Sequence, residues 1–176
     1  MTSIAVKYRL RAHSTTGKPV VFCLRPHKRC NKPLEVCFTL DDAGDRYIKK
    51  GRARRVSLKE AEVVLKKANE NGLVHLSLYR PDHRVFALCS CCPCCCHDLQ
   101  ILKQCDRKDL VVRSETVAVT DLSKCKDCGT CVERCHFEAR ALDGETMKYE
   151  PDKCYGCGLC VTACPQEAIS MRRLSP

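Results

Sequence analysis

The chain has 176 residues, which is enough for one domain or two small ones. It contains 18 cysteines, no tryptophan and only 5% aromatic residues. Its longest apolar run is far below the ~18 residues of a membrane helix, and its first residues lack the layout of a secretory signal. These features argue against a membrane span and against a disulfide framework, which needs an oxidising compartment. We expect a cytoplasmic protein of a largely anaerobic setting, whose cysteines bind an inorganic cofactor.

Positive charge is concentrated in the first part of the chain. The formal net charge is +10. Residues 1–110 carry 22 Lys and Arg against 11 Asp and Glu, whereas residues 111–176 carry 9 against 10. This asymmetry predicts two domains, a basic cysteine-rich domain over residues 1–110 and a second domain over residues 111–176.

The first part alternates between strand-like and irregular stretches. Residues 4–13 alternate apolar and basic side chains and predict a half-buried strand, and residues 20–24 predict a second strand. Residues 25–56 are poorly periodic, so we expect loops, with one short element near residues 34–40 and a turn at residues 41–44.

A helix with a clear start follows. Ser57 and Glu60 have the spacing of a capping box, and Gly72 supplies a stop. Residues 73–79 and 85–88 are expected to be extended, with a turn at residues 81–82 between them. Residues 97–104 predict a short helix with Leu99 and Leu102 on its inner side. The inner stripe of the first helix should consist of Leu58, Ala61, Leu65 and Ala68.

Six of the eight residues from 89 to 96 are cysteines, a stretch called here the Cys89–Cys96 run. Adjacent cysteines rarely join in one disulfide, because the geometry is strained. The density favours a metal or cluster site, with redox thiol chemistry and simple packing as the open alternatives. Cys23, Cys30, Cys37 and Cys105 are further possible ligands, and the sequence does not choose among them. The candidate ligands of the run itself are Cys89, Cys91, Cys92, Cys94, Cys95 and Cys96.

Two later stretches share the spacing C-x2-C-x2-C-x3-C, which is typical of [4Fe-4S] sites. The first run spans Cys125–Cys135 and the second spans Cys154–Cys164. Three cysteines on a tight loop can bind three irons of one cluster, while the fourth points away and binds the other cluster. Zinc needs four ligands and does not require this repeated run. We therefore assign Cys125, Cys128, Cys131 and Cys164 to cluster 1, and Cys154, Cys157, Cys160 and Cys135 to cluster 2.

Residues 121–171 thereby resemble the bacterial two-cluster ferredoxins. The resemblance implies an α+β protein whose C-terminal domain is ferredoxin-like, with a βαβ pseudo-repeat, beside a small basic α+β domain. It also implies that a strand over residues 115–119 pairs with residues 168–172. Asp143 and Gly144 predict a hairpin turn between residues 139–142 and 147–150. One departure is His136, where the family usually has proline, as Pro165 is in the second run.

The Cys89–Cys96 run resembles a segment of larger iron–sulfur proteins of anaerobes. In those proteins a Gly-Leu-Val-His segment, here residues 72–75, precedes the cysteines, and a ferredoxin module follows. We expect two [4Fe-4S] clusters, with a third or more as an open possibility. The main hypothesis is an electron carrier or a subunit of an anaerobic oxidoreductase, with an acidic redox partner or an oxidoreductase complex as its partner.

Two alternative functions remain open, and a zinc or metal-storage role for the Cys89–Cys96 run is a further option. The first is a redox enzyme whose Cys89–Cys96 run reduces a substrate with electrons from the ferredoxin module. The second is an iron–sulfur redox or oxygen sensor that binds nucleic acid. We do not expect nucleic-acid binding, because helix-turn-helix signals and interleaved aromatic residues are lacking.

Overall fold

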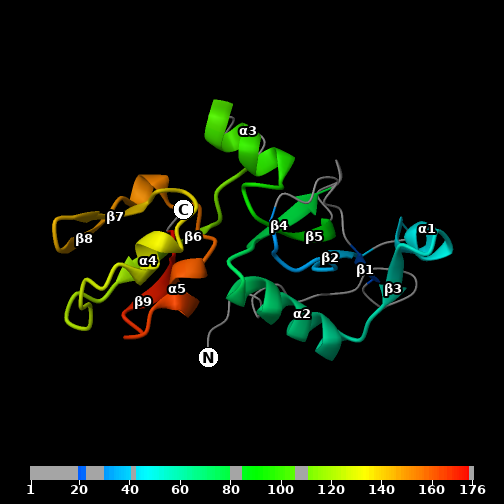
Figure 1. The fold of residues 1–176 in the computed structure, drawn as a ribbon, viewed down its shortest axis with the longest axis horizontal. Helices are drawn as coiled ribbons and strands as arrows, with labels where there is room; N and C mark the ends of the chain where they lie inside the picture. Colours follow the sequence, from blue (N-terminus) through cyan, green and yellow to red (C-terminus); the bar gives the residue numbers. More distant parts are fainter. Residues whose placement is uncertain (1–19, 23–29, 41–42, 80–84, 106–110, 175–176) are drawn as a thin grey trace. The chain divides into compact units, whose positions relative to one another are not determined.

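The computed structural model describes residues 20–22, 30–40, 43–79, 85–105 and 111–174 (Figure 1). The chain divides into two compact units, Met1–Cys96 and His97–Pro176. The strand expected over residues 4–13 and the turn expected at residues 81–82 lie outside the described residues. The domain boundary expected after residue 110 stays a prediction.

The first unit contains a five-stranded antiparallel sheet with the strand order β3-β1-β2-β5-β4. The strand expected from residue 20 and the extended stretches expected over residues 73–79 and 85–88 correspond to β1, β4 and β5, and β5 continues to Cys91. The strands are β1 (Val20–Phe22), β2 (Cys37–Thr39), β3 (Ala53–Arg55), β4 (Val74–Tyr79) and β5 (Val85–Cys91).

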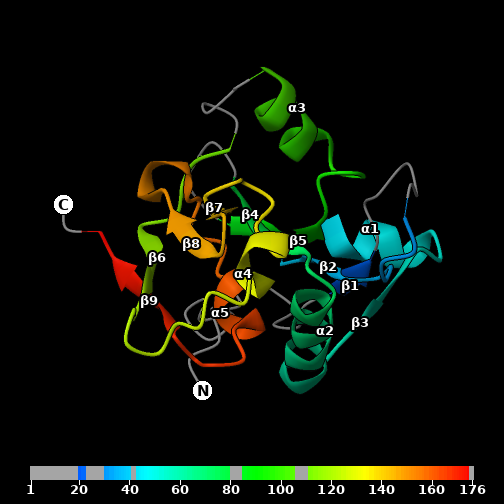
Figure 2. The ribbon, with the colours of Figure 1, turned by 60° about the vertical axis from the view of Figure 1, so that its left-hand side comes forward.

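Helix α2 (Leu58–Glu70) packs on one face of this sheet (Figure 2). Side chains alternate along a strand, so Leu88 faces the helix while Cys89 and Cys91 lie on the other face of β5. The core on the helix side is apolar, which fixes the register of β2 against β5. Its buried members are Val21, Phe38, Val56, Ala61, Leu65 and Leu88.

Both ends of α2 have the predicted signals. The Glu60 N–H donates to Ser57 Oγ at 3.2 Å, and the Ser57 N–H donates to Glu60 Oε2 at 2.8 Å, so the capping box is confirmed. At the other end Gly72 has φ +69, and the N–H groups of Gly72 and Leu73 donate to the carbonyls of Asn69 and Ala68. This is a Schellman ending.

The predicted apolar stripe of α2 is wrong at one residue, Leu58. Leu58 is 51% exposed, whereas Ala61, Leu65 and Ala68 are buried. Leu58 is the first residue of the helix, and Val56 before the cap takes the buried position against Ala61. That pair is a hydrophobic staple, which sets how the chain enters the helix.

The expectation of loops over residues 25–56 is only partly confirmed. Strand β2 does fall within residues 34–40, but the structure also contains α1 (Ala43–Lys49) and β3. Gly44, expected in a turn, lies in α1. A Cβ at Gly44 would stand 2.8 Å from Val20 Cγ2, so glycine lets the short helix approach β1.

The second unit begins with α3 (His97–Cys105), which confirms the short helix expected there. Leu99 and Leu102 are buried as expected, and Lys103 Nζ lies 3.0 Å from Glu138 Oε1. None of the described helices is long and apolar enough to span a membrane. The remaining elements are β6 (Thr116–Thr120), α4 (Thr130–Glu133), β7 (Arg140–Asp143), β8 (Thr146–Tyr149), the 3-10 helix η2 (Pro151–Lys153), α5 (Leu159–Ala163) and β9 (Ile169–Arg173).

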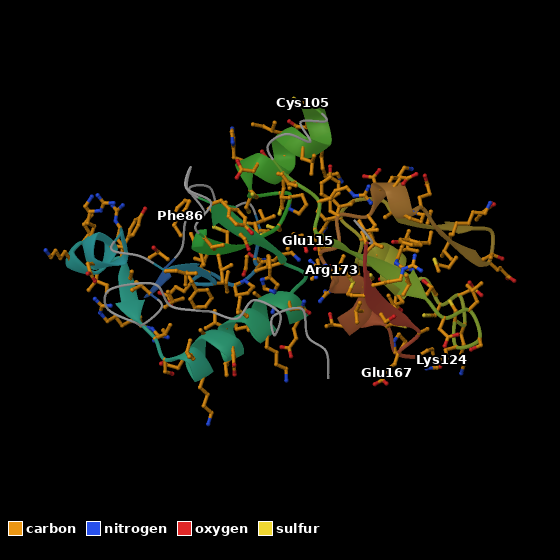
Figure 3. The ribbon with its side chains drawn as sticks, turned by 180° about the vertical axis from the view of Figure 1, so that it is seen from behind. Phe86, Cys105, Glu115, Lys124, Glu167 and Arg173 are labelled. Carbon is orange, nitrogen blue, oxygen red and sulfur yellow. The ribbon has the colours of Figure 1, made fainter. Side chains whose placement is uncertain are left out.

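The pairings expected in this unit are confirmed. Strands β6 and β9 pair antiparallel, with Val117 opposite Arg172. Figure 3 shows Glu115 and Arg173 at one end of this pair, where Arg173 Nη2 donates to Glu115 Oε2 at 2.7 Å. Strands β7 and β8 form the hairpin, and Gly144 in its turn has φ +60.

The two cysteine runs form a structural repeat with an offset of 29 residues. Gly129 and Gly158 precede α4 and α5 with φ values of +74 and +72. Further along, Glu138 and Glu167 both have positive φ, and the next residue in each half is a buried alanine. The sequence repeat is therefore also a repeat of backbone conformation.

Candidate metal centres

The cysteines assigned to cluster 1 line one cavity of the second unit. About 350 Å³ of empty space lies between the first run, the end of the second run and the start of β9. Apolar groups of Met147, Ala168 and Ile169 line the same space. Three of the four cysteines come from the first run and one from the second. They are Cys125, Cys128, Cys131 and Cys164.

The cysteines assigned to cluster 2 line a second cavity of about 310 Å³. Phe137 and Tyr155 also line it, with their rings stacked at a centroid distance of 4.6 Å. Here three cysteines come from the second run, and the fourth is the last cysteine of the first run. They are Cys154, Cys157, Cys160 and Cys135.

Positive-φ residues shape the loops that carry these thiols. Asp127 and Gly156 occupy equivalent positions in the two runs, with φ values of +50 and +69. A Cβ at Gly156 would stand 1.9 Å from the carbonyl oxygen of Thr116, so only glycine lets the second loop lie against β6. Ser114 N–H donates to the Tyr155 carbonyl at 3.2 Å, which holds the same contact.

Burial disfavours the thiolate form of several of these cysteines. It raises the pKa of Cys157 to about 12, and it also raises the pKa values of Cys131 and Cys160. Cys128 is exposed, and a hydrogen bond with the Thr130 hydroxyl lowers its pKa. Buried thiols of this kind ionise when a metal cluster binds, because the metal charge replaces the proton.

A buried arginine lies beside both sets of thiols. Arg140 is 3% exposed, and its Nη1 donates to Thr120 Oγ1 at 3.0 Å and contacts Cys131 Sγ at 3.9 Å. Its guanidinium also interacts with Cys160 and lies 4.5 Å from the centre of the Tyr149 ring. Sequence reasoning missed this residue. The available signal was the repeat, since the residue 29 positions later is Ile169.

The residues around both cavities fit [4Fe-4S] clusters. Each cavity offers four thiol sulfurs, which are the usual ligands of such clusters. Among the described residues, the buried Nη2 of Arg140 has no hydrogen-bond partner, so it can donate to a cluster sulfur. Bound clusters would supply one-electron redox chemistry, while the chain supplies ligands, an apolar wall and a buried positive charge.

Residues 124–168 match the family model of the 4Fe-4S dicluster domain. The second unit therefore contains a domain of the type that binds [4Fe-4S] clusters. No curated protein matches the chain. Together with the cysteine arrangement, the family match supports an iron–sulfur electron-transfer protein.

The Cys89–Cys96 run of the first unit separates into two groups of thiols. Cys92, Cys94 and Cys95 lie beside Cys30. Cys89 and Cys91 share one face of β5, because they alternate with Ser90, and Cys91 hydrogen-bonds with Cys96. Phe38 of β2 pairs with Leu88 of β5, and the neighbouring Cys37 hydrogen-bonds with Cys89. The second group consists of Cys37, Cys89, Cys91 and Cys96, all buried.

The two groups differ in their electrostatics. Hydrogen bonds to Cys37, Cys89 and Cys96 hold the pKa of Cys91 well above its usual range. By contrast, the Lys32 backbone N–H donates to the thiol of Cys30 and lowers its pKa to about 7. Every cysteine that the structure describes is a free thiol.

The remaining candidates lie elsewhere. Cys105 is exposed at the end of α3 (Figure 3), and Cys23 lies outside the described residues. Of the further ligands that the sequence left open and the structure describes, Cys30 and Cys37 contact the run. The spacing of seven residues between Cys30 and Cys37 does not show which of these two cysteines joins which group of thiols.

Proposed function

We propose that the chain is an electron carrier, or an electron-transferring subunit of an anaerobic oxidoreductase. Two [4Fe-4S] clusters would occupy the second unit, and a further cluster or metal site would lie in the Cys89–Cys96 run. The observation that carries the proposal is the arrangement of two cavities, each lined by three cysteines of one run and the last cysteine of the other. With one ligand of each cluster supplied by the other run, the two clusters would share both loops, and electrons would pass between them.

The proposal includes an α+β fold with a ferredoxin-like C-terminal domain. The pairing of β6 with β9 and the hairpin of β7 and β8 support it, because both follow from the ferredoxin resemblance and the repeat. The basic first unit supports an acidic partner, either a redox protein or an oxidoreductase complex, in the cytoplasm.

The test begins with iron and acid-labile sulfide on anaerobically purified protein. We expect at least about eight of each per chain, and paramagnetic signals of [4Fe-4S]⁺ after reduction with dithionite. Fewer than about six irons per chain would contradict the two-cluster proposal.

Paired alanine variants test whether the fourth ligand of each cluster comes from the other cysteine run. If Cys128 and Cys164 serve one cluster, the double variant Cys128→Ala/Cys164→Ala retains about four of eight irons. The matched variant Cys128→Ala/Cys135→Ala affects both clusters and retains almost none. The reverse pattern would show that each run binds its own cluster.

Electron delivery is tested with an acidic ferredoxin as the acceptor. The reduced protein should pass electrons to it at a rate that falls as salt is added, because exposed opposite charges are screened. A rate that does not depend on salt would contradict an electrostatic partner surface.

A further inference from the structure

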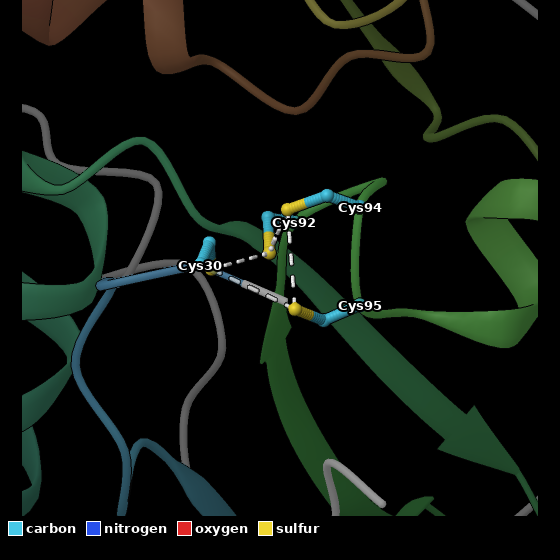
Figure 4. Close-up of side chains that lie close together, drawn as sticks. All are labelled: Cys30, Cys92, Cys94 and Cys95. Atoms are coloured by element: carbon cyan, nitrogen blue, oxygen red, sulfur yellow. Dashed lines mark hydrogen bonds between the residues drawn. The ribbon is translucent and has the colours of Figure 1, made fainter. Parts of the chain in front are cut away.

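Four thiols of the first unit converge on one point, as Figure 4 shows. Cys30 comes from the segment before β2, and the other three come from the turn that follows β5. Cys30 Sγ lies 3.6 Å from Cys92 Sγ and 3.6 Å from Cys95 Sγ. Cys94 Sγ lies 3.0 Å from Cys92 Sγ and 3.9 Å from Cys95 Sγ. All four sulfurs lie within 4.8 Å of one another.

These separations have the size of a coordination sphere around a single ion. With a metal–sulfur distance of about 2.3 Å, four sulfurs at the corners of a tetrahedron stand about 3.8 Å apart. A four-iron cluster bonds each thiolate to a different iron atom, so its thiolates must be farther apart. A disulfide would bring two sulfurs to about 2.0 Å, and these four are separate.

The ferredoxin runs provide a comparison within the same chain. Their eight cysteines are all described, yet among the described residues only the Cys30 group gathers three or more ligand atoms this closely. The eight thiols instead line two separate cavities, four to each. The fold thus spaces one kind of site for clusters and the other for one ion.

Hydrogen bonds and apolar packing fix the positions of the four thiols. The Cys92 carbonyl accepts the N–H groups of Cys95 and Cys96 at 3.1 and 3.0 Å, which forms the turn. Cys92 and Cys95 are separated by two residues, a spacing common among structural zinc ligands. Both pack in a buried apolar cluster with Val36, Ala68 and Leu73.

The Cys30 side of the group is also anchored. Lys32 Nζ donates to the backbone carbonyl of Asn71 at 2.5 Å, which ties this segment to the end of α2. The Lys32 backbone N–H donates to Cys30 Sγ, a hydrogen bond that suits a metal-bound thiolate. Residues 62 apart in sequence are therefore brought together by two independent elements.

We propose that Cys30, Cys92, Cys94 and Cys95 bind one zinc ion in a structural site with four protein ligands. Tetrahedral coordination by four thiolates is typical of zinc, and four protein ligands leave no open position for substrate. The proposal deepens the part of the proposed function that places a third metal site in the Cys89–Cys96 run. It does not depend on the two clusters of the second unit.

The first experiment measures zinc and iron in the full chain after anaerobic purification. We expect about one zinc beside about eight irons per chain. Cys94→Ala should lose the zinc and keep all the iron, since Cys94 is the exposed member of the group and its loss leaves the core packed. The control Cys105→Ala removes another exposed cysteine and should keep both metals.

A second variant separates loss of a ligand from loss of folding. Cys94→His retains a zinc ligand and should restore about one zinc per chain. With cobalt(II) as the probe in place of zinc, the wild-type site should give the strong sulfur-to-cobalt absorption of four thiolates. Cys94→His should weaken that absorption by about a quarter, because one of four thiolates is replaced.

The possible results separate this proposal from the function proposed above. About twelve irons and no zinc would overturn the zinc site and place a third cluster there. Eight irons, no zinc and no cobalt uptake would also overturn it and favour thiol chemistry in the run. About one zinc with fewer than about six irons would support the zinc site while contradicting the two-cluster carrier.

Discussion

Arg140 places a positive charge where the apolar core of a symmetric repeat would have an isoleucine. Its counterpart Ile169 is buried and apolar, whereas the guanidinium of Arg140 interacts with Cys131 of one set and Cys160 of the other. An arginine this deeply buried is rare unless it is paired with negative charge. Cluster-bound thiolates would provide that charge, since the described partners of its Nη1 are neutral hydroxyl, thiol and thioether groups.

Replacing Arg140 with methionine should make both clusters harder to reduce. Reduction adds a negative charge, which a nearby cation stabilises, so removing the cation lowers the reduction potential. We expect Arg140→Met to lower the midpoint potentials by roughly 50–100 mV, measured by dye-mediated titration followed by EPR. Arg140→Lys keeps the charge and should recover most of the difference.

Arg172→Met is the control for this substitution, because Arg172 is exposed on β9. It should leave the potentials unchanged. Unchanged potentials in an Arg140→Met protein that still holds about eight irons would show that the arginine does not tune the clusters.

At the residue scale, the sequence singles out the cysteines of the second unit but not the residues around them. The spacing of the two runs is local, so both sets of four could be assigned before any fold was known. Arg140 could not be found in this way, because composition rules place arginine on the surface. Only the comparison of Arg140 with Ile169 through the repeat carried the signal.

At the element scale, helix α2 depends on its first turn. Ser57→Ala removes the side-chain acceptor of the Glu60 N–H and should destabilise the first unit by about 1 kcal/mol. Ser57→Gly should cost only a few tenths of a kcal/mol, because water can reach the freed N–H groups. The measurement is the denaturant midpoint of the first unit, and equal losses for alanine and glycine would contradict the capping role.

Gly156 and Gly144 form a matched pair in the second unit. Both have positive φ, but an added Cβ meets the Thr116 carbonyl at Gly156 and nothing within 4 Å at Gly144. Gly144→Ala should therefore cost only the backbone strain, about 1–2 kcal/mol. Gly156→Ala should in addition displace the loop between Cys154 and Cys157 and lose about half of the iron.

Iron content and thermal midpoint, measured on both glycine variants, check this prediction. Full iron content in Gly156→Ala would mean that β6 moves aside and that the contact with Thr116 does not position the loop.

Elements with complete local signals were predictable, and short elements were not. Helix α2 has a capping box and a glycine stop, and the hairpin has its Asp-Gly pair, so both were found. Strand β3 has three residues and forms because β1 supplies its hydrogen bonds. Leu58 was misplaced because apolar periodicity does not show where a helix meets its sheet.

At the scale of the whole molecule, the two units differ in what stabilises each of them internally. The first unit has a five-stranded sheet with a helix packed on it. The described strands of the second unit form two separate two-stranded sheets, and its main apolar cluster includes Cys131 and Cys160. Two-stranded sheets are marginally stable alone, so metal binding should supply much of the stability of the second unit.

The asymmetry of charge predicted that the chain has two parts, but it could not predict the thiol groups of the first unit. Cys30 joins the Cys89–Cys96 run across 62 residues of sequence, through the order of strands in the sheet. Strand order depends on long-range packing, which a single sequence does not reveal.

Loss of the clusters should therefore unfold the second unit and leave the first unit folded. The zinc proposed at Cys30 and its three partners does not depend on iron, so removal of the clusters should leave that zinc bound. We expect amide hydrogens of β6 and β9 to lose protection in the iron-free protein, while those of α2 and β5 keep theirs. Hydrogen exchange followed by mass spectrometry measures both in one sample. Unchanged protection of β6 and β9 would mean that apolar packing alone holds the second unit, while loss throughout the chain would mean that the two units fold as one.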